Sequence, residues 1–334
     1  MPKVIWYFRK KRALGNFSIE NSFRELLPHF EGTQWEIEWR EASWFSEGIW
    51  NRLRIALEAR RLDADIVQIT GDINFAALFL KRCKSVLTIH DNGFLEEHRG
   101  WKRWLMKKVW LDWPLMRCDR VVAVSNATKR SILEHTNYPE DQIEVIHSVV
   151  PSHFKPRTVL PNNPKPVLLH IGLAPNKNLK GHAEAIQGMD VLLRIIGEPS
   201  AADHTMLQSM GIDYEWKSKL SDEEMQEAYA TSDVLLFCST LEGFGIPILE
   251  AKAVGVPVIT SDMEPMNEVG KEFAYFAPPL NSKQLRQTVL KVLHLERNEV
   301  GSMHKSARQE AAESHEGVYR QLTFQRLDSM KTSN

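Results

Sequence analysis

One stretch of the sequence, residues 234–260, constrains the fold more than any other. It begins with an apolar run, Val234 to Cys238, which is too short for a typical helix and is typical of a strand buried on both faces. A glycine-containing loop follows, and then a helix that Pro247 favours in its first turn and Gly255 at its end. A second apolar run, Val256 to Thr260, completes the unit. This order predicts a parallel sheet with the loop at its carboxyl edge, where the free amides of a helix N-terminus favour anions.

Two acidic residues accompany this loop. Glu242 lies in the loop itself, and Glu250 lies about one turn into the predicted helix. Carboxylates accept hydrogen bonds from vicinal hydroxyls, so one could hold a ribose and the other a second sugar beside a phosphate. The alternative stays open that Glu250 only favours a helix N-terminus and that Glu242 is a solvated loop acid.

The segment Glu242-Gly-Phe-Gly-Ile-Pro-Ile-Leu-Glu250 resembles the E-x7-E motif of the retaining nucleotide-sugar glycosyltransferases of family four. The flanking segments Ala228 to Asp233, Gly255 to Thr260 and Glu268-Val-Gly fit the same family pattern. The resemblance covers roughly residues 65–325 and is weaker at the N-terminus. It implies an α/β protein with the GT-B fold, in which two Rossmann-like domains place their parallel sheets toward an inter-domain cleft.

The resemblance also implies site residues in both domains. Lys177 lies in a segment that resembles the family's diphosphate loop, where Leu173 replaces the usual arginine, so Lys177, and after it Lys180, must neutralise more of the phosphate charge. His90 ends an apolar strand and resembles the family's histidine that contacts the donor sugar or phosphate region; a structural role for this lone histidine stays open. The implied catalytic residues are Glu242, His90 and Lys177, and the implied donor-binding residues are Gly172, Asn178, Lys219, Leu220, Gly243, Phe244, Gly245 and Glu250.

A proline-rich segment, residues 151–166, divides the chain and is typical of a linker between domains. We therefore expect an N-terminal, acceptor-side domain over residues 1–152, to which residues 318–334 cross back. The donor-binding domain is expected over residues 153–317. At 334 residues the chain is long enough for two domains with substantial cores.

Composition narrows the cellular setting. Hydrophobic residues make up 43% and charged residues 25% of the chain, which is ordinary for a soluble globular protein. The net charge of -1 does not indicate nucleic acid as a partner. Cys83, Cys118 and Cys238 are scattered without metal-like spacing, which favours a reducing compartment. Neither a signal peptide nor a membrane span is evident, so we expect a cytoplasmic protein.

No metal or other cofactor is expected, and the nucleotide-diphosphate sugar serves as co-substrate. Asp63-Ala-Asp65 looks like the metal-binding D-x-D of other glycosyltransferases. It precedes its strand, however, whereas open parallel sheets bind ligands beyond the carboxyl ends of their strands. No two histidines stand three or four residues apart, as a helical zinc site would need.

Two segments raise the question of contact with a membrane. The segment Trp101 to Trp113 mixes tryptophans with lysines and arginine, as peripheral membrane surfaces do. Its basic residues fall on several sides of a helical wheel, so we favour a helix half-buried in the domain and leave the membrane alternative open. The basic run Arg9 to Arg12 follows the first predicted strand. It could meet a phosphate, an anionic acceptor or the inner face of a membrane, and a solvated turn is equally favoured.

The function expected from this sequence is transfer of a sugar from a nucleotide-diphosphate sugar to a hydroxyl of a glycan or lipid-linked acceptor, with retention at the anomeric carbon. Such a reaction would serve surface polysaccharide or glycolipid synthesis. Two alternatives stay open, namely a nucleotide-sugar epimerase and a non-catalytic module that binds a sugar nucleotide.

Overall fold

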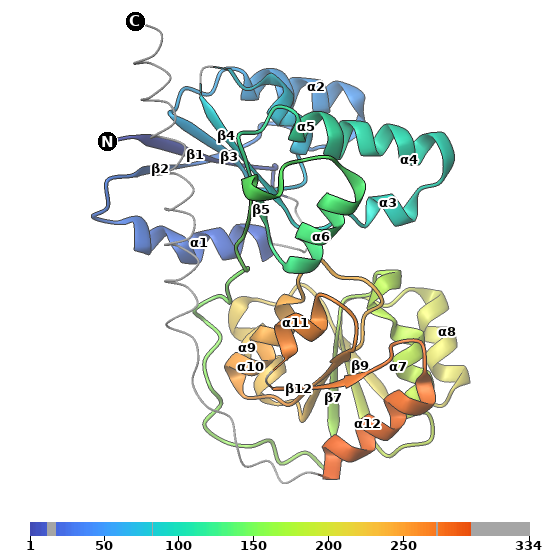
Figure 1. Cartoon of the computed structure of the whole chain (residues 1–334). Helices are drawn as coiled ribbons and strands as arrows, with labels where there is room; N and C mark the ends of the chain where they lie inside the picture. The colour runs from blue at the N-terminus through green and yellow to red at the C-terminus, as the bar shows by residue number, and fades with distance from the viewer. Residues whose placement is uncertain (12–17, 82, 272, 295–334) are drawn as a thin grey trace, which may run out of the picture. The chain divides into compact units, whose positions relative to one another are not determined.

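The computed structural model describes residues 1–11, 18–81, 83–271 and 273–294 (Figure 1). The chain divides into two compact units between Val149 and Val150, and each unit has its own parallel sheet. Residues 151–166, the predicted linker, contain no helix or strand. The predicted return of residues 318–334 to the first unit lies outside the described residues.

The sheet of the first unit is built from strands that all run parallel. Their order across the sheet is β2 (Glu36–Glu41), β1 (Lys3–Phe8), β3 (Ile66–Ile69), β4 (Lys84–Ile89), β5 (Arg120–Ala123) and β6 (Ile143–Val145). The connecting helices are α1 (Ser18–Phe30), α2 (Gly48–Ala59), η1 (Asn74–Phe79), α3 (Phe94–Glu97), α4 (Gly100–Lys107), η2 (Lys108–Asp112), α5 (Trp113–Leu115), α6 (Asn126–His135) and η3 (Glu140–Gln142).

Helices cover both faces of this sheet because alternate strand residues point to opposite sides. On β1, Val4, Trp6 and Phe8 pack in one core with residues of α1, whereas Ile5 and Tyr7 pack in a second core with residues of α2. Figure 1 shows α1 on one side of the sheet and α2 on the other. Burial on both faces is what the continuous apolar strands of the sequence predict.

The second unit repeats this plan. Its parallel strands lie in the order β12 (Ala274–Ala277), β11 (Val258–Ser261), β10 (Val234–Phe237), β7 (Val167–Ile171), β8 (Leu192–Ile196) and β9 (Tyr214–Lys217). Its helices are η4 (Pro175–Lys177), α7 (Leu179–Ile186), α8 (Ala201–Ser209), α9 (Asp222–Ala230), α10 (Ile246–Val254), α11 (Met266–Gly270) and α12 (Ser282–His294). Residues of α7 and α12 share one core, and residues of α10 and α11 share the other.

The stretch that the sequence singled out forms β10, α10 and β11, as predicted. Pro247 lies in the first turn of α10, and Gly255 ends the helix in the left-handed conformation with φ of 93°. The predicted capping box is also present, since the Ser221 side chain accepts from the amide of Glu224 and the Glu224 carboxylate accepts from the amide of Ser221. Local sequence signals therefore define this part of the fold.

Each sheet contains one point where the chain changes direction across it. In the first unit the chain passes from β1 to β2 and then returns to β3 on the other side of β1. In the second unit it passes from β7 outward to β9 and returns to β10 on the other side of β7. Open parallel sheets bind ligands outside the carboxyl ends of the two strands that flank such a switch point. The loops after β1 and β3, and those after β7 and β10, are therefore the candidate ligand loops.

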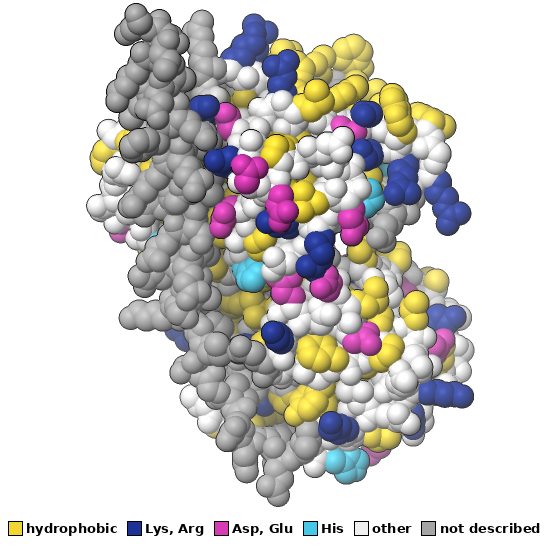
Figure 2. Space-filling view, in the orientation of Figure 1, with side chains coloured by type: hydrophobic (Ala, Val, Ile, Leu, Met, Phe, Trp, Pro, Cys, Tyr) yellow, Lys and Arg dark blue, Asp and Glu magenta, His cyan; other side chains and the backbone are white. Residues whose placement is uncertain are grey.

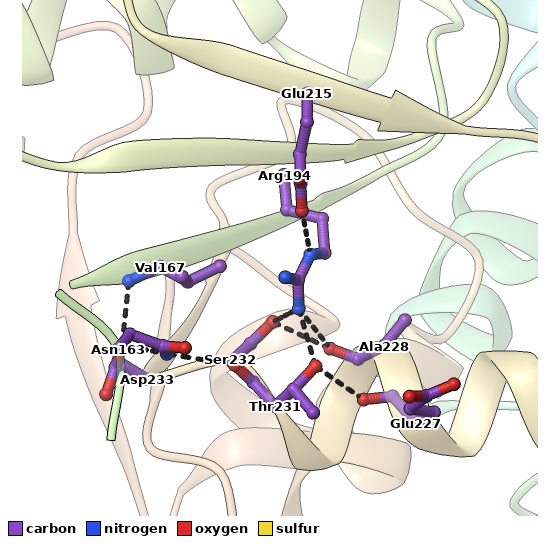
Figure 3. Close-up of polar contacts among 9 residues, drawn as sticks. All are labelled: Asn163, Val167, Arg194, Glu215, Glu227, Ala228, Thr231, Ser232 and Asp233. Atoms are coloured by element: carbon purple, nitrogen blue, oxygen red, sulfur yellow. Dashed lines mark hydrogen bonds and ion pairs between the residues drawn. The ribbon is translucent and has the colours of Figure 1, made fainter. Parts of the chain in front are cut away.

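The opposite, amino-terminal edge of the second sheet is held together by buried and partly buried polar contacts (Figure 3). The Arg194 guanidinium on β8 donates to Thr231 Oγ1 at 2.7 Å and to Glu215 Oε1 at 2.5 Å. The Asp233 carboxylate, just before β10, accepts from the amide of Val167 at 2.7 Å. These bonds fix β7, β8, β9 and β10 to one another near their amino-terminal ends. The carboxyl ends of the strands, where open parallel sheets bind ligands, are therefore where a site is expected.

Candidate functional site

A lysine and a glutamate meet at the carboxyl edge between β7 and β10. Lys177 Nζ lies 2.6 Å from Glu242 Oε1 and 4.7 Å from the centre of the Phe237 ring. The two charged side chains are only 21% and 11% exposed. The lysine stem passes close to Gly172, where φ is +85° and a Cβ atom would lie 3.2 Å from that stem. The structure thus brings three predicted site residues together around one half-buried cation.

The loops that carry this ion pair are tied to each other through asparagine side chains. Asn176 Nδ2 donates to Leu241 O at 2.8 Å, and the amide of Thr240 donates to Asn176 O at 2.8 Å. Asn178, in the left-handed conformation with φ of 59°, donates through Nδ2 to Cys238 O at 3.1 Å. The amide of the predicted site residue Asn178 therefore binds backbone and fixes the loop.

Glu250 lies on α10 beside this pair, with an altered acidity. Burial raises the pKa of its carboxyl to about 7, while a hydrogen bond from Tyr229 and the charge of Lys177 act in the opposite direction. The bond from Tyr229 Oη to Glu250 Oε2 is 2.6 Å long. Burial also raises the pKa of Tyr229 well above its usual value, so its hydroxyl remains a donor. Glu250 is therefore a carboxylate whose charge can be lost near neutral pH.

The predicted glycine loop precedes α10. Gly245 has φ of +97°, a conformation that glycine adopts without strain, and Phe244 just before it is buried. Gly243 lies between Phe244 and Glu242 in the same loop. The N-terminus of a helix, where this loop ends, favours an anion.

Two other predicted donor residues lie farther along the sheet. Lys219, with φ of 57°, and the half-buried Leu220 follow β9, which lies two strands from β7 at the same carboxyl edge. Leu173, where the family commonly has arginine, packs with the core and lies against Gly197; a Cβ atom at Gly197 would be 2.8 Å from Leu173 Cδ1. The Leu173 side chain therefore contributes to the packing of the core.

His90 belongs to the loop after β4 in the first unit. Its Nε2 lies 2.7 Å from Thr70 O, and because a carbonyl only accepts, Nε2 carries the proton. In the neutral ring this leaves Nδ1 as an acceptor. Gly71 permits the contact, since a Cβ atom there would lie 2.5 Å from His90 Cδ2.

Arg9 begins the basic run that could meet an anion, a membrane or only solvent, and the structure holds it between carboxylates of its own unit. Its side chain is 11% exposed and pairs with Glu20 Oε1 at 3.2 Å and with Asp72. Lys10 Nζ donates to Ser43 O at 3.0 Å. Arg12 lies outside the described residues. At the switch point of the first sheet the Arg9 guanidinium therefore lies between two carboxylates.

The favoured interpretation of the segment Trp101 to Trp113 as a half-buried helix is wrong for its first part. No residue of α4 is buried, and Trp101 and Trp104 are 70% and 60% exposed. The periodicity of the sequence could not reveal this exposure, because a helical pattern does not say whether another element covers the apolar face.

Three contact partners of these side chains are not indicated by the sequence motifs. They are Tyr229, which binds Glu250, and the Arg9 partners Glu20 and Asp72. Tyr229 lies in the segment Ala228 to Asp233, which fits the family pattern without indicating a role for the tyrosine. The signal for Asp72 was its place directly after Gly71 at the end of β3, on the ligand edge.

The comparisons with known proteins agree with this arrangement. A family model described as "Glycosyltransferase Family 4" matches residues 33–153, and one described as "Glycosyl transferases group 1" matches residues 153–313. The chain belongs to the family-four glycosyltransferases. The two models meet at residue 153, close to the division between the two units.

Curated relatives of this family-four glycosyltransferase include O-antigen enzymes. It is 28% identical to the O-antigen chain mannosyltransferase RfbU of Salmonella typhimurium over 63% of this chain and 61% of that protein. It is 29% identical to the O-antigen chain mannosyltransferase B of Escherichia coli over 52% of this chain and 51% of that protein. The chain thus spans about half to three-fifths of the length of these relatives.

Solved structures show the fold. Anabaena HepE, in complex with UDP and glucose, superposes with a TM-score of 0.67 over 100% of both chains at 14% identity. The apo form of the lipopolysaccharide outer core galactosyltransferase WaaB gives a TM-score of 0.64 over 97% of this chain and 99% of that chain at 18% identity. The prediction of a GT-B protein with two parallel-sheet units is confirmed.

No helix among the described residues has the length and apolar character that crossing a bilayer requires. No group of three or more His, Cys, Asp or Glu side chains there is arranged to hold a metal ion.

Proposed function

We propose that this family-four glycosyltransferase transfers a sugar from a nucleotide-diphosphate sugar to a glycan or lipid-linked hydroxyl, with retention at the anomeric carbon. The observation that carries the proposal is the contact between Lys177 and Glu242 beside Glu250, at the switch point of the second sheet. A cation, helix amides and two carboxylates suit a diphosphate that bears sugars on both sides.

In the proposed reaction, charge develops on the diphosphate as the glycosidic bond breaks. Lys177 and the amides at Phe244 and Gly245 would stabilise that charge by preorganised electrostatics. Glu250 would accept from the ribose hydroxyls. Glu242 would bind the transferred sugar and stabilise its oxocarbenium-like centre. Retention would follow from attack on the face that the diphosphate leaves, with a donor phosphate oxygen taking the acceptor's proton. No metal enters this scheme.

Because Glu242 already neutralises Lys177, the diphosphate must replace or share this carboxylate as a partner of the lysine. Its arrival would free Glu242 to turn toward the sugar. The proposed role of Glu242 therefore depends on occupancy of the phosphate position.

The first unit would supply the acceptor side. His90, with Nε2 bound to Thr70 O, offers Nδ1 as an acceptor for a sugar hydroxyl. Asp72 and Arg9 at the switch point of the first sheet offer an acceptor and a donor of hydrogen bonds. These groups favour a hydroxyl-rich acceptor.

The test is turnover of a panel of GDP- and UDP-activated hexoses in excess chelator, with product configuration read by NMR. The curated relatives named mannosyltransferases make nucleotide-activated mannose the first donor to try. Retained configuration at full rate in chelator supports the proposal. An inverted product, or turnover that returns only with Mg²⁺ or Mn²⁺, contradicts it, and binding without turnover over many acceptors would indicate a binding module.

The pKa of Glu250 gives a pH dependence with a defined sign. Ribose hydroxyls donate to the ionised carboxylate, so nucleotide-diphosphate affinity should rise as pH increases through about 7 and level off above it. Below that value affinity should fall by up to roughly tenfold per pH unit. Calorimetric titration of UDP and GDP between pH 5.5 and 8.5 measures it. Glu250→Gln is the control, because its remaining pH dependence comes from the nucleotide phosphate; equal profiles for both proteins would contradict the assignment.

We further propose peripheral contact with a membrane surface through α2 and α4. Figure 2 shows hydrophobic side chains gathered over these helices, with Lys and Arg side chains beside them. On α4 the exposed large hydrophobic residues are Trp101, Trp104 and Leu105, and on α2 they include Ile49 and Trp50. The Arg52 guanidinium of α2 lies 4.5 Å from the ring centre of Trp110 in η2, which joins the two surfaces. Exposed tryptophans among basic residues favour an anionic interface.

Replacing Trp101 and Trp104 together by alanine should lower binding to vesicles containing anionic phospholipid at least about tenfold. Co-sedimentation with vesicles measures the change. Trp216→Ala, which removes an exposed tryptophan of the second unit, is the control. Equal vesicle binding by the double variant and the control would contradict the contact.

A further inference from the structure

Two buried histidines lie beneath the candidate site, and neither has a part in the proposed chemistry. His170 is on β7 and His182 is on α7, and both are almost completely inaccessible to solvent. Their Nδ1 atoms lie 2.8 Å apart. His182 Nε2 lies 3.1 Å from the amide nitrogen of Cys238, the residue that follows β10. The pair therefore spans β7, α7 and the end of β10.

The position of the pair coincides with the split in the sheet. The ladder between β7 and β10 pairs Val234 with Leu168 and Leu235 with Leu169. His170 is the next residue of β7 after Leu169. Beyond this point the two strands lead into the loops with Lys177 and Glu242. Where the backbone pairing of β7 with β10 ends, the side chains of His170 and His182 therefore form the contact between the two strands.

The hydrogen-bond donors and acceptors fix how these rings are protonated. A backbone amide only donates, so His182 Nε2 accepts and its proton is on Nδ1. That proton is donated to His170 Nδ1, which places the proton of His170 on Nε2. Burial lowers the pKa of His170 to about 4 and that of His182 well below its usual value, and nearby Lys177 adds to the effect on His170. Both rings are neutral, each in one tautomer.

The backbone of Cys238 is held at both its N–H and its C=O by residues of α7 and its N-cap. His182 accepts from its N–H, and Asn178, four residues earlier and on the same side of the helix start, donates to its C=O. Cys238 opens the loop to Glu242, and Asn178 directly follows Lys177. The clamp therefore joins the segment that carries the lysine to the segment that leads to the glutamate.

We infer that His170 and His182 form a neutral positioning pair that holds the Lys177 loop and the Glu242 loop in register across the split between β7 and β10. The effect on donor binding rests on the proposed function, whereas the protonation pattern stands without it. With leucine in place of His182, the buried Cys238 amide would lose its acceptor and the clamp would lose one of its two bonds.

The first experiment needs no ligand. Long-range ¹H–¹⁵N spectra of ¹⁵N-histidine protein should show Nδ1–H on His182 and Nε2–H on His170, unchanged between pH 5.5 and 8. His170→Phe and His182→Gln proteins assign the two signals, and the exposed His29 gives the reference for a ring in contact with water. A charged ring or the reverse tautomer on either residue would overturn the inference.

The second experiment measures UDP and GDP affinity by calorimetry at a temperature well below unfolding. His182→Leu should lower affinity at least tenfold. His182→Gln, whose amide can accept from Cys238 and donate to His170, should stay within threefold of wild type. Thr231→Val removes a bond to Arg194 at the opposite edge of the same sheet, so it should lower the melting temperature and leave affinity within threefold.

The outcomes separate the inference from the proposed function. If His182→Leu binds nucleotide as well as wild type, or if His182→Gln is as weak as the leucine variant, the positioning role is overturned. If wild type itself binds no nucleotide diphosphate, the proposed function fails together with the donor-site role. The spectra still decide the protonation of the pair in that case, including when the leucine variant does not fold.

Discussion

Lys177→Ala should reduce turnover by more than about a hundredfold, which corresponds to a barrier increase of about 2.7 kcal/mol. Losing one partner of a partly buried charge pair typically costs about 2–5 kcal/mol. Here the loss is not shared, because Leu173 packs against Gly197 where the family commonly has a cation. Steady-state rates with a turnover-competent donor measure the effect.

Lys180→Ala is the matched control. Lys180 is 72% exposed and pairs only loosely, at 3.8 Å, with Glu184 one turn along α7. Its removal should leave the rate within about twofold, since exposed pairs contribute little. A Lys177→Ala protein that stays within tenfold of wild type would mean that the diphosphate is held elsewhere. Because Lys177→Ala also leaves Glu242 without this partner, thermal melting should accompany the rates.

Glu250→Ala should weaken nucleotide-diphosphate binding roughly tenfold to a hundredfold, the effect of hydrogen bonds to a charged group of about 1.5–3 kcal/mol. Glu242→Ala should chiefly lower the maximal rate, because its proposed partner is the transferred sugar. Calorimetry with nucleotide diphosphate and steady-state kinetics with donor separate the two effects.

Tyr229→Phe refines this comparison. It keeps the ring and removes the hydroxyl that donates to Glu250, a bond that holds the Glu250 pKa down. The pKa of Glu250 should therefore rise further, and the pH at which affinity levels off should move upward.

Equal losses of affinity in the Glu250→Ala and Glu242→Ala proteins would contradict the division of roles between these two residues.

The sequence predicts the fold well where local signals decide it. The β10–α10–β11 unit follows from an apolar run, a proline in the first turn and a terminal glycine, all within one segment. The capping box at Ser221 is local in the same sense. These features depend on chain neighbours, so a single sequence contains them.

The electrostatics of the site could not be predicted in this way. Lys177 and Glu242 are 65 residues apart in the chain, and Tyr229 and Glu250 are 21 apart. The raised pKa of Glu250 depends on burial and on these distant partners. The sequence likewise does not reveal that Arg9 pairs with Glu20 of α1 and with Asp72 in the loop after β3, because these partners are distant in the chain. The exposure of α4 was missed because a helical pattern does not say whether a neighbour covers it.

The ion pair between Lys177 and Glu242 also bears on how ligands reach the site. An unpaired lysine in a loop would attract phosphate over a long range and would accumulate any abundant small anion. With Glu242 at 2.6 Å the resting pair has no net charge, so its field falls off within a short distance. Encounter then gains little from electrostatic steering, and a ligand is retained only if it can separate the pair and bind both partners at once. Inorganic phosphate offers the lysine a partner but gives the glutamate none. In the proposed function a sugar nucleotide provides for both, so we expect this pair to discriminate between ligands by dwell time, before any chemistry begins.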